Sequence, residues 1–292
     1  MTRRWLKVAI TFTAIFLLSL SVSTQTAQAF SWLDFLLRGV QIIQISNISE
    51  QEEVALGGQI DQRIRRQVKI SSNAQANELV KTIGAELVPH SDRPQIPYTF
   101  QVVEDPEINA FATLGGYVYV NTGTIAAADN RAQLAAVIAH EIGHIAGRHS
   151  LEQLKQAAIA EGILTLVGAD RNELVRLGTA IGVTLPRSRE DEFDADRRGL
   201  FNLARAGYAP QAMPKFMEKL GSAATGLVDL NFLSTHPPVP DRIAFLNSLI
   251  QEHNLQGSKG LDDASYQQTW RNFPGEARQK RQGGSTLKLR LQ

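Results

Sequence analysis

Apolar residues recur at helical spacing along most of the chain after residue 48. Ser49 followed by Glu52 is a capping box, in which each residue caps the backbone of the other, so a helix is predicted from Glu50 to about Gln67. The same spacing predicts further helices over residues 74–87, 130–147, 150–166, 170–180, 189–205, 210–220 and 240–252. The chain is therefore predicted to be mainly helical.

Three short stretches between the second and third of these helices are predicted to be strands. Residues 98–103 follow a proline and are rich in aromatic and β-branched residues. Residues 108–111 and 117–120 are joined across Gly115-Gly116, and the alternation over 117–120 suits a pleated surface. Because the strands cluster early and helices outnumber them, the predicted fold class is α+β, with a small sheet in a mainly helical domain.

The first 29 residues have the order of a secretory signal peptide. Three basic residues precede a mostly apolar run over residues 8–22, and Ala27-Gln28-Ala29 is an A-x-A cleavage site. A retained membrane anchor is the alternative, but this run is shorter than the roughly 20 apolar residues that a span needs. We therefore expect removal of residues 1–29 and export to the periplasm or an equivalent space outside the cytoplasm.

The rest of the chain is predicted to hold one domain between two flanking segments. Residues 30–48 are apolar and aromatic with helical spacing, which favours a helix packed on the domain; peripheral membrane contact through Phe30 to Ile45 is the alternative. No repeat or long linker divides residues 49–253. Residues 254–292 are polar and weakly basic without a clear period, so we expect a loosely ordered tail.

The composition of the chain excludes several kinds of site and partner. The chain has no cysteine, which excludes thiolate catalysis, disulfides and cysteine-ligated metals. Its 30 basic and 29 acidic residues give a net charge of +1, so nothing indicates a nucleic-acid partner.

The sequence His140-Glu141-Ile142-Gly143-His144 is an H-E-x-x-H motif inside a predicted helix. Residues four apart lie on one helix face, so both imidazoles can bind one metal ion. Apolar neighbours indicate that this helix is buried, and a buried glutamate is costly without a partner. These features favour one Zn²⁺ per chain, with Glu141 beside it as the group that takes a proton from water.

The third ligand has a near and a distant candidate. If the helix continues, His149 lies about 140° around from His144 and faces away, so it is expected to be a helix-end residue rather than a ligand. Glu192 and Asp196 lie four apart on another predicted helix. Glu192 is the better ligand, and Asp196 is placed to accept a hydrogen bond from the outer N–H of a zinc-bound histidine.

Four separate blocks of the sequence resemble one enzyme family, the zinc endopeptidases of peptidase family M48, which includes HtpX, BepA, the Oma-type mitochondrial protease and the CAAX prenyl endopeptidases. The blocks are INAFATLGGYVYVNTG (108–123), LAAVIAHEIGHIAGRHS (134–150), SREDEFDADRRG (188–199) and STHPPVPDRI (234–243). The likeness extends over about residues 49–250. It implies a gluzincin-type zinc peptidase domain with an edge strand at the active site.

The resemblance also implies roles for single residues. It makes His140, His144 and Glu192 the zinc ligands, Glu141 the general base and Asp196 the carboxylate behind the ligands. His236 matches a histidine near the metal that stabilises the oxyanion or closes the resting site. Arg242 matches a basic residue that we expect to be structural.

The resemblance places the substrate along Asn109-Ala110-Phe111, an edge strand that an extended polypeptide can join through main-chain hydrogen bonds. The sequence departs from the pattern of the family at two other places. Leu114 replaces the proline that often precedes the two glycines, which leaves the geometry of this loop open. Residues 151–187 carry charges that prevent them from spanning a membrane, unlike the matching region of several members of the family.

Together these features predict a zinc-dependent metalloendopeptidase that hydrolyses exported, misfolded or misassembled polypeptides, in protein quality control of the cell envelope. A chaperone-like protein that holds its clients beside a closed zinc site, with little turnover, is the alternative. The same residues serve both functions, so the sequence leaves the choice open.

Overall fold

The computed structural model describes residues 48–163, 169–223, 236, 240–262, 264–271 and 273. Contacts divide the chain into residues 1–44 and 45–292, and the described residues all belong to the second unit. The predicted signal peptide and the apolar segment up to residue 47 lie outside the described residues. Within the described part, none of the helices has the length and apolar character that crossing a membrane requires.

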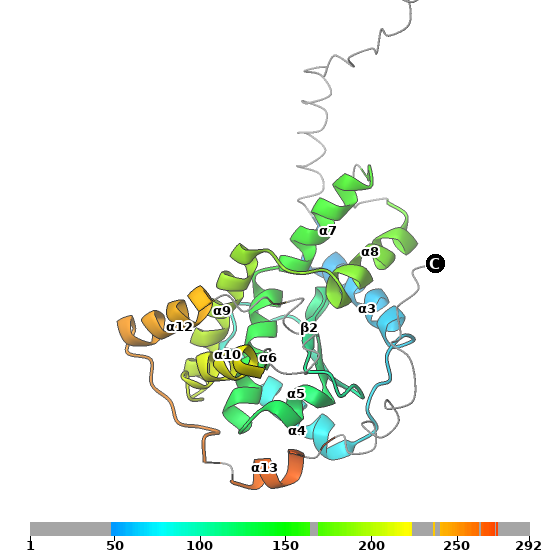
Figure 1. Ribbon diagram of the computed structural model, residues 1–292. Coiled ribbons are helices and arrows are strands. Elements are labelled where there is room, and N and C mark those ends of the chain that lie inside the picture. Colours follow the sequence, from blue (N-terminus) through cyan, green and yellow to red (C-terminus); the bar gives the residue numbers. More distant parts are fainter. Residues whose placement is uncertain are drawn as a thin grey trace, which may run out of the picture. The chain divides into compact units, whose positions relative to one another are not determined.

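Helices make up most of the described chain (Figure 1), as the sequence predicted. They are α3 (Glu50–Ile64), α4 (Ala74–Leu87), α5 (Thr122–Ala127), α6 (Arg131–Ala146), α7 (His149–Ala160), α8 (Arg171–Val183), α9 (Arg189–Arg205), α10 (Ala212–Ala223), α12 (Pro240–Glu252) and α13 (Ala264–Trp270), with short 3-10 turns at Val88–His90 and Leu114–Gly116. The capping box predicted at the start of α3 is present. The six-residue α5 was not predicted, because fewer than two turns are too short to show a helical period.

The described strands form one three-stranded sheet with the order β1-β3-β2. Strand β1 (Thr99–Val103) runs parallel to β3 (Tyr117–Asn121), and β2 (Ala110–Ala112) runs antiparallel to β3. The turn from β2 to β3 uses two glycines with positive φ, Gly115 at 76° and Gly116 at 95°, a backbone conformation that side chains disfavour. The predicted pair of strands joined across these glycines is therefore confirmed, and β2 is an edge strand.

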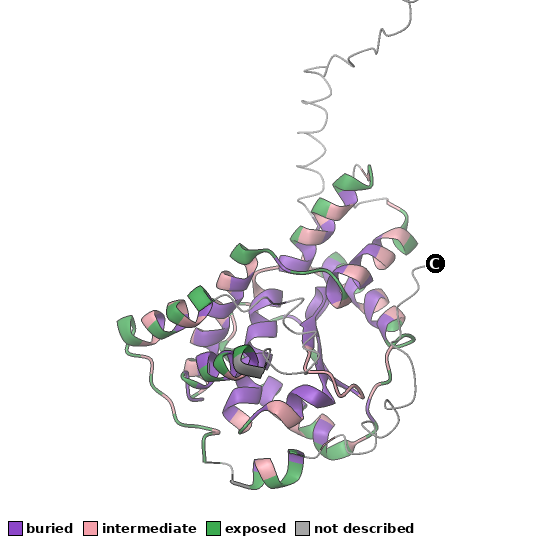
Figure 2. Cartoon of the chain, in the orientation of Figure 1, coloured by how far each residue is buried: buried purple, intermediate pink, exposed green. Residues whose placement is uncertain are grey.

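The sheet separates two apolar clusters. Figure 2 shows that the strands and the helices beside them are largely buried. Val102 and Val118 contribute to the cluster that includes α4 and α6. Tyr119 and Phe111 lie on the other face, with ring centroids 4.6 Å apart, in the cluster that includes α3, α7 and α8. Because side chains alternate across a strand, each strand serves both clusters. This gives an α+β arrangement of helices on both faces of a small sheet.

Helix α6 lies at the centre of this arrangement (Figure 1), and every residue from Ala132 to Ile145 is buried. It packs closely against α9, because glycines occupy the points of contact. A Cβ atom on Gly143 would lie 2.5 Å from the carbonyl oxygen of Ala195. One on Gly199 would lie 2.9 Å from the carbonyl oxygen of Ala139. The H-E-x-x-H helix and the acidic helix can therefore approach almost backbone to backbone.

The first part of the predicted tail packs on the domain. Its helix α13 buries Tyr266 and Trp270, and the Tyr266 hydroxyl donates a hydrogen bond of 2.8 Å to the carbonyl of Ile125. The expectation of a loosely ordered tail is therefore wrong for this part. Two aromatic residues four positions apart give the helix an apolar face, which the polar composition of the segment hid.

Candidate metal centre

Two histidines of α6 form one side of the site. His140 and His144 are one helical turn apart, and their Nε2 atoms lie 3.0 Å from each other. Both side chains are buried, at 3% and 1% exposure. Their rings meet edge to face, so the two nitrogens point at one location rather than past each other.

Glu192 reaches the same location from the first turn of α9. Its Oε2 lies 3.5 Å from His140 Nε2, and its Oε1 lies 3.3 Å from His144 Nε2. The Ser188 side chain caps this helix by accepting a hydrogen bond of 3.0 Å from the backbone N–H of Asp191, which fixes where the first turn begins. The sequence prediction that Glu192 joins the two histidines is thus matched by the geometry.

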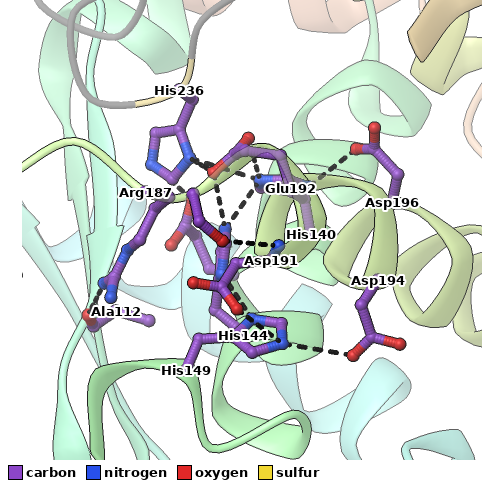
Figure 3. Close-up of polar contacts among 12 residues, drawn as sticks. Ala112, His140, His144, His149, Arg187, Asp191, Glu192, Asp194, Asp196 and His236 are labelled. Atoms are coloured by element: carbon purple, nitrogen blue, oxygen red, sulfur yellow. Dashed lines mark hydrogen bonds and ion pairs between the residues drawn. The ribbon is translucent and has the colours of Figure 1, made fainter. Parts of the chain in front are cut away.

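His236 completes the cluster from a different part of the chain. Its Nδ1 lies 2.8 Å from Glu192 Oε1 and 3.4 Å from His140 Nε2. The ligand atoms of these four buried residues lie within 4.8 Å of one another, and Figure 3 shows His236 and Glu192 converging on the two histidines. The cluster therefore offers three nitrogen donors and one carboxylate.

The carboxylate of Glu141 shows that these residues suit a metal ion. It is fully buried, and neither of its oxygens has a hydrogen-bond partner among the described residues; His236 Nε2 is 3.6 Å from Oε1. A buried carboxylate without partners is unfavourable unless a cation or a water bound to one lies next to it. Imidazole nitrogen and carboxylate oxygen are the donors that zinc prefers in hydrolytic sites.

A second carboxylate lies behind the ligands. Asp196 Oδ1 is 2.9 Å from His140 Nδ1, the nitrogen that faces away from the cluster. Burial alone would lower the pKa of His140, but its contacts with the Asp196 and Glu192 carboxylates outweigh burial and raise it to about 9. The surroundings of His140 therefore favour positive charge, as a site for a divalent cation must.

Arg242 holds both carboxylates in place. Its Nε and Nη2 donate to the two oxygens of Asp196 at 2.6 and 2.7 Å, and its Nη1 lies 2.6 Å from Glu192 Oε2. Burial raises the pKa of the Asp196 carboxyl, but the hydrogen bonds and charges of Arg242 and His140 together outweigh burial and hold the pKa below its usual range. The sequence indicated only a structural role for Arg242, and the structure shows that this role is to position the metal site.

His149 does not face away from the site as the sequence predicted. Helix α6 ends at Ala146, and Arg148 adopts a left-handed conformation with φ 58° and ψ 27°. The chain therefore turns back, and His149 Nδ1 comes to 2.9 Å from His144 Nδ1. The prediction assumed a continuous helix, and the glycine at position 147 was the signal for the break. His149 is still not among the clustered ligands.

The predicted substrate strand lies at the sheet edge, and its main-chain groups alternate in direction. The carbonyl of Asn109 accepts a hydrogen bond of 2.9 Å from β3, and the N–H of Thr113 donates one of 2.9 Å to β3. The ladder repeats every two residues, so Phe111 also faces β3. The main-chain groups of Ala110 and Ala112 therefore point to the outer edge, where the carbonyl of Ala112 accepts a hydrogen bond from Arg187.

Arg187 is a buried residue beside this edge that the sequence did not single out. Its Nη2 donates a hydrogen bond of 3.0 Å to the carbonyl of Ala112 (Figure 3). Its Nη1 donates one of 2.6 Å to Gln153 Oε1. Burial lowers the pKa of Arg187 below its usual range. The residue fixes the end of β2 relative to the start of α9. Its position just before the cap of α9 gave no signal of this contact.

Comparison with known proteins identifies the family. The family model described as peptidase family M48 matches residues 74–250. The beta-barrel assembly-enhancing protease of Escherichia coli (strain K12) is 29% identical over 213 residues, which cover 68% of this chain and 44% of that protein. The mitochondrial metalloendopeptidase OMA1 of Schizosaccharomyces pombe is 31% identical over 196 residues, which cover 65% and 57%. That of Arabidopsis thaliana is 38% identical over 143 residues, which cover 49% and 29%.

The chain thus spans less than half the length of the Escherichia coli relative. The family match nevertheless covers more than half of this chain and includes both helices that supply the clustered ligands. The chain belongs to peptidase family M48, and His140, His144 and Glu192 form its zinc site.

Proposed function

We propose that the protein is a zinc metalloendopeptidase that hydrolyses peptide bonds in exported polypeptides that are unfolded or misassembled. The observation that carries the proposal is the Glu141 carboxylate. It is fully buried, lacks a hydrogen-bond partner among the described residues, and lies next to the ligands of the zinc site. A site that only held a structural metal would have no use for such a group.

The residues around the cluster have different roles in the proposed reaction. Zinc, when bound, supplies a Lewis acid that polarises the scissile carbonyl and lowers the pKa of water to about 7. Glu141 takes the proton from the attacking water and delivers it to the leaving amine. His236, with Nε2 3.6 Å from Glu141, is placed to donate a hydrogen bond to the developing oxyanion.

The substrate pairs with the outer edge of β2. The main-chain groups of Ala110 and the N–H of Ala112 point to this edge, whereas those of Asn109 and Phe111 face β3. The carbonyl of Ala112 already accepts a hydrogen bond from Arg187, so the proposed main-chain contacts are those of Ala110 and the N–H of Ala112. Pairing of this kind reads the backbone of the substrate, so it suits unfolded polypeptides of varied sequence.

Two observations support an envelope location and misassembled substrates. Residues 1–29 have the pattern of a secretory signal peptide, which supports export from the cytoplasm. The Escherichia coli relative is named as a protease that enhances β-barrel assembly. A protease with these features serves protein quality control in the periplasm or an equivalent space.

The position of His236 favours a second candidate function. Its Nδ1 lies within the cluster of ligand atoms, so the four residues can surround a metal ion as a closed set. A site closed in this way would prevent water and substrate from reaching the metal. This is expected of a chaperone-like protein that binds its clients with little turnover. The two functions differ in whether His236 leaves the cluster when a substrate binds.

Cleavage of unfolded casein by the purified protein tests the proposal, with Glu141→Gln as the comparison. Glutamine keeps the size of the side chain but cannot accept a proton, so we expect kcat to fall by about 100- to 10,000-fold while zinc stays at one per chain. Continued cleavage by this variant would refute the mechanism. If neither protein cleaves and both hold zinc, His236→Ala is the next variant to measure. Cleavage by His236→Ala would show a closed peptidase site, at a rate lowered by the loss of the oxyanion donor.

A further inference from the structure

The outer face of the second zinc histidine is occupied by another histidine. His144 directs Nε2 toward Glu192 and turns Nδ1 toward His149, whose Nδ1 is 2.9 Å away. On its far side, His149 Nε2 lies 3.2 Å from Asp194 Oδ2 (Figure 3). Three side chains thus form a line that leads away from the metal site to the surface of α9.

This line fixes the tautomer of each ring. A histidine that binds zinc through Nε2 carries its proton on Nδ1, so His144 donates to Nδ1 of His149. His149 must then carry its own proton on Nε2, where it donates to the Asp194 carboxylate. Arg197 and Arg198 hold this carboxylate, with Arg197 Nη2 2.7 Å from Oδ1 and Arg198 Nε 2.5 Å from Oδ2.

The backbone is shaped to bring His149 to this position. Arg148 adopts φ 58°, a conformation that is unfavourable for a residue with a Cβ atom. It is held there by an ion pair of 2.9 Å to the buried Glu53 and by a hydrogen bond of 3.1 Å to the carbonyl of Ile48.

Gly147 makes room for the returning ring. A Cβ atom at this position would lie 2.3 Å from His149 Nε2 and 2.9 Å from Asp194 Oδ2. Any other residue would therefore push the imidazole or the carboxylate out of line. The strained turn at Arg148 and the glycine at the point of contact both serve to position His149 between His144 and Asp194. This indicates a specific interaction rather than an incidental contact between side chains.

The first zinc histidine is held in a related way, from the same helix. His140 Nδ1 lies 2.9 Å from Asp196, which Arg242 holds through two hydrogen bonds. Helix α9 thus supplies Glu192 to the cluster, Asp196 directly behind one histidine, and Asp194 behind the other through an inserted imidazole.

We propose that His149 and Asp194 are positioning residues of the zinc site, which orient His144 and fix its tautomer through the chain His144–His149–Asp194. The inference rests on the zinc-peptidase function proposed above, but its readout is zinc affinity, which requires no substrate. A lack of casein cleavage would count against the proposed function, while the affinity measurement would still decide this inference.

The test compares variants of the purified full chain by competition for zinc with a chromogenic chelator. We expect His149→Ala and Asp194→Asn to weaken zinc binding, with a loss of about 10- to 100-fold for His149→Ala. His149→Asn places an amide close to the position of Nδ1, so it should restore part of the affinity that His149→Ala loses. Absorption bands of the Co²⁺-substituted protein should shift in His149→Ala, because they report the orientation of the ligands.

Matched controls separate positioning from stability. His253→Ala removes an exposed imidazole, and Glu190→Gln removes an exposed carboxylate from the first turn of α9; both should bind zinc as the wild type does. Wild-type affinity and an unshifted Co²⁺ spectrum in both His149→Ala and Asp194→Asn would overturn the proposal. So would equal affinity of His149→Asn and His149→Ala. If the metal-free His149→Ala protein does not fold, Asp194→Asn decides the matter alone, because Asp194 is partly exposed.

Discussion

At the scale of single residues, the site depends on Arg242 as much as on the ligands. Its side chain is 1% exposed and pairs with Asp196 and Glu192, which are exposed by 0% and 2%. Two carboxylates buried this close together would repel each other without a cation between them. The guanidinium supplies that charge with a planar set of donors, which a lysine could not reproduce.

We expect Arg242→Met to lower the free energy of unfolding of the metal-free protein by about 3–5 kcal/mol, because it leaves two buried charges without their partner. Arg189→Met is the matched control. Arg189 pairs with Asp241 at 2.7 Å, but the two side chains are 56% and 63% exposed, so its loss should change stability by about 1 kcal/mol or less. Urea unfolding measures both, and equal effects would show that Arg242 does not balance the two carboxylates.

At the scale of elements, the site exists because α6 and α9 approach without side chains between them. Gly143 sits inside the H-E-x-x-H motif and faces the backbone of α9 at Ala195. Interiors are packed too densely to accept an added methyl group without displacement. A wider spacing would move Glu192 and Asp196 away from the two histidines together.

The substitution Gly143→Ala tests this close approach. Alanine normally stabilises a helix by about 0.5–1 kcal/mol relative to glycine. Here its Cβ would lie 2.5 Å from a carbonyl oxygen, so we expect a net loss of about 1–3 kcal/mol and weaker zinc binding. Gly221→Ala on α10 is the control, because no described atom lies within 4 Å of its Cβ and the substitution should leave stability unchanged or raised. Thermal unfolding that gives the same sign for both would contradict this account of the contact between the helices.

At the scale of the whole molecule, the C-terminal segment completes the domain that carries the site. The carbonyl of Gly260 accepts a hydrogen bond of 3.0 Å from the N–H of Ala132 at the start of α6. Tyr266 and Trp270 of α13 join the apolar cluster on the α6 side of the sheet. The segment therefore supports the first turn of the helix that holds both zinc histidines.

We expect Trp270→Ala to cost about 3–5 kcal/mol of stability, because the indole is 7% exposed and its removal leaves a cavity. Thr269→Ala, at an exposed position of the same helix, should cost less than about 1 kcal/mol. Guanidinium unfolding of the two variants provides the comparison. A small effect of Trp270→Ala would mean that the segment is not part of the cooperative domain.

Much of the fold and the core of the site could be predicted from the sequence, because the signals are local. The four-residue spacing of His140 and His144 puts both on one helix face, and that of Glu192 and Asp196 does the same on another helix. A capping serine precedes both α3 and α9, so the sequence indicates where each of these helices begins. Periodicity and capping act within one or two turns, and a single sequence shows them directly.

Tertiary structure decided the features that depend on contacts between distant segments. The left-handed turn at Arg148 depends on Glu53, almost a hundred residues earlier, and it redirects His149 from solvent to the zinc ligand. Arg242 meets its two carboxylates only because α12 packs against α9. The aromatic residues of α13 form an apolar face, and the core that this face covers comes from distant segments. Spacing along the chain specifies which residues share a face. Which groups meet across the interior depends on packing, and no local pattern encodes it.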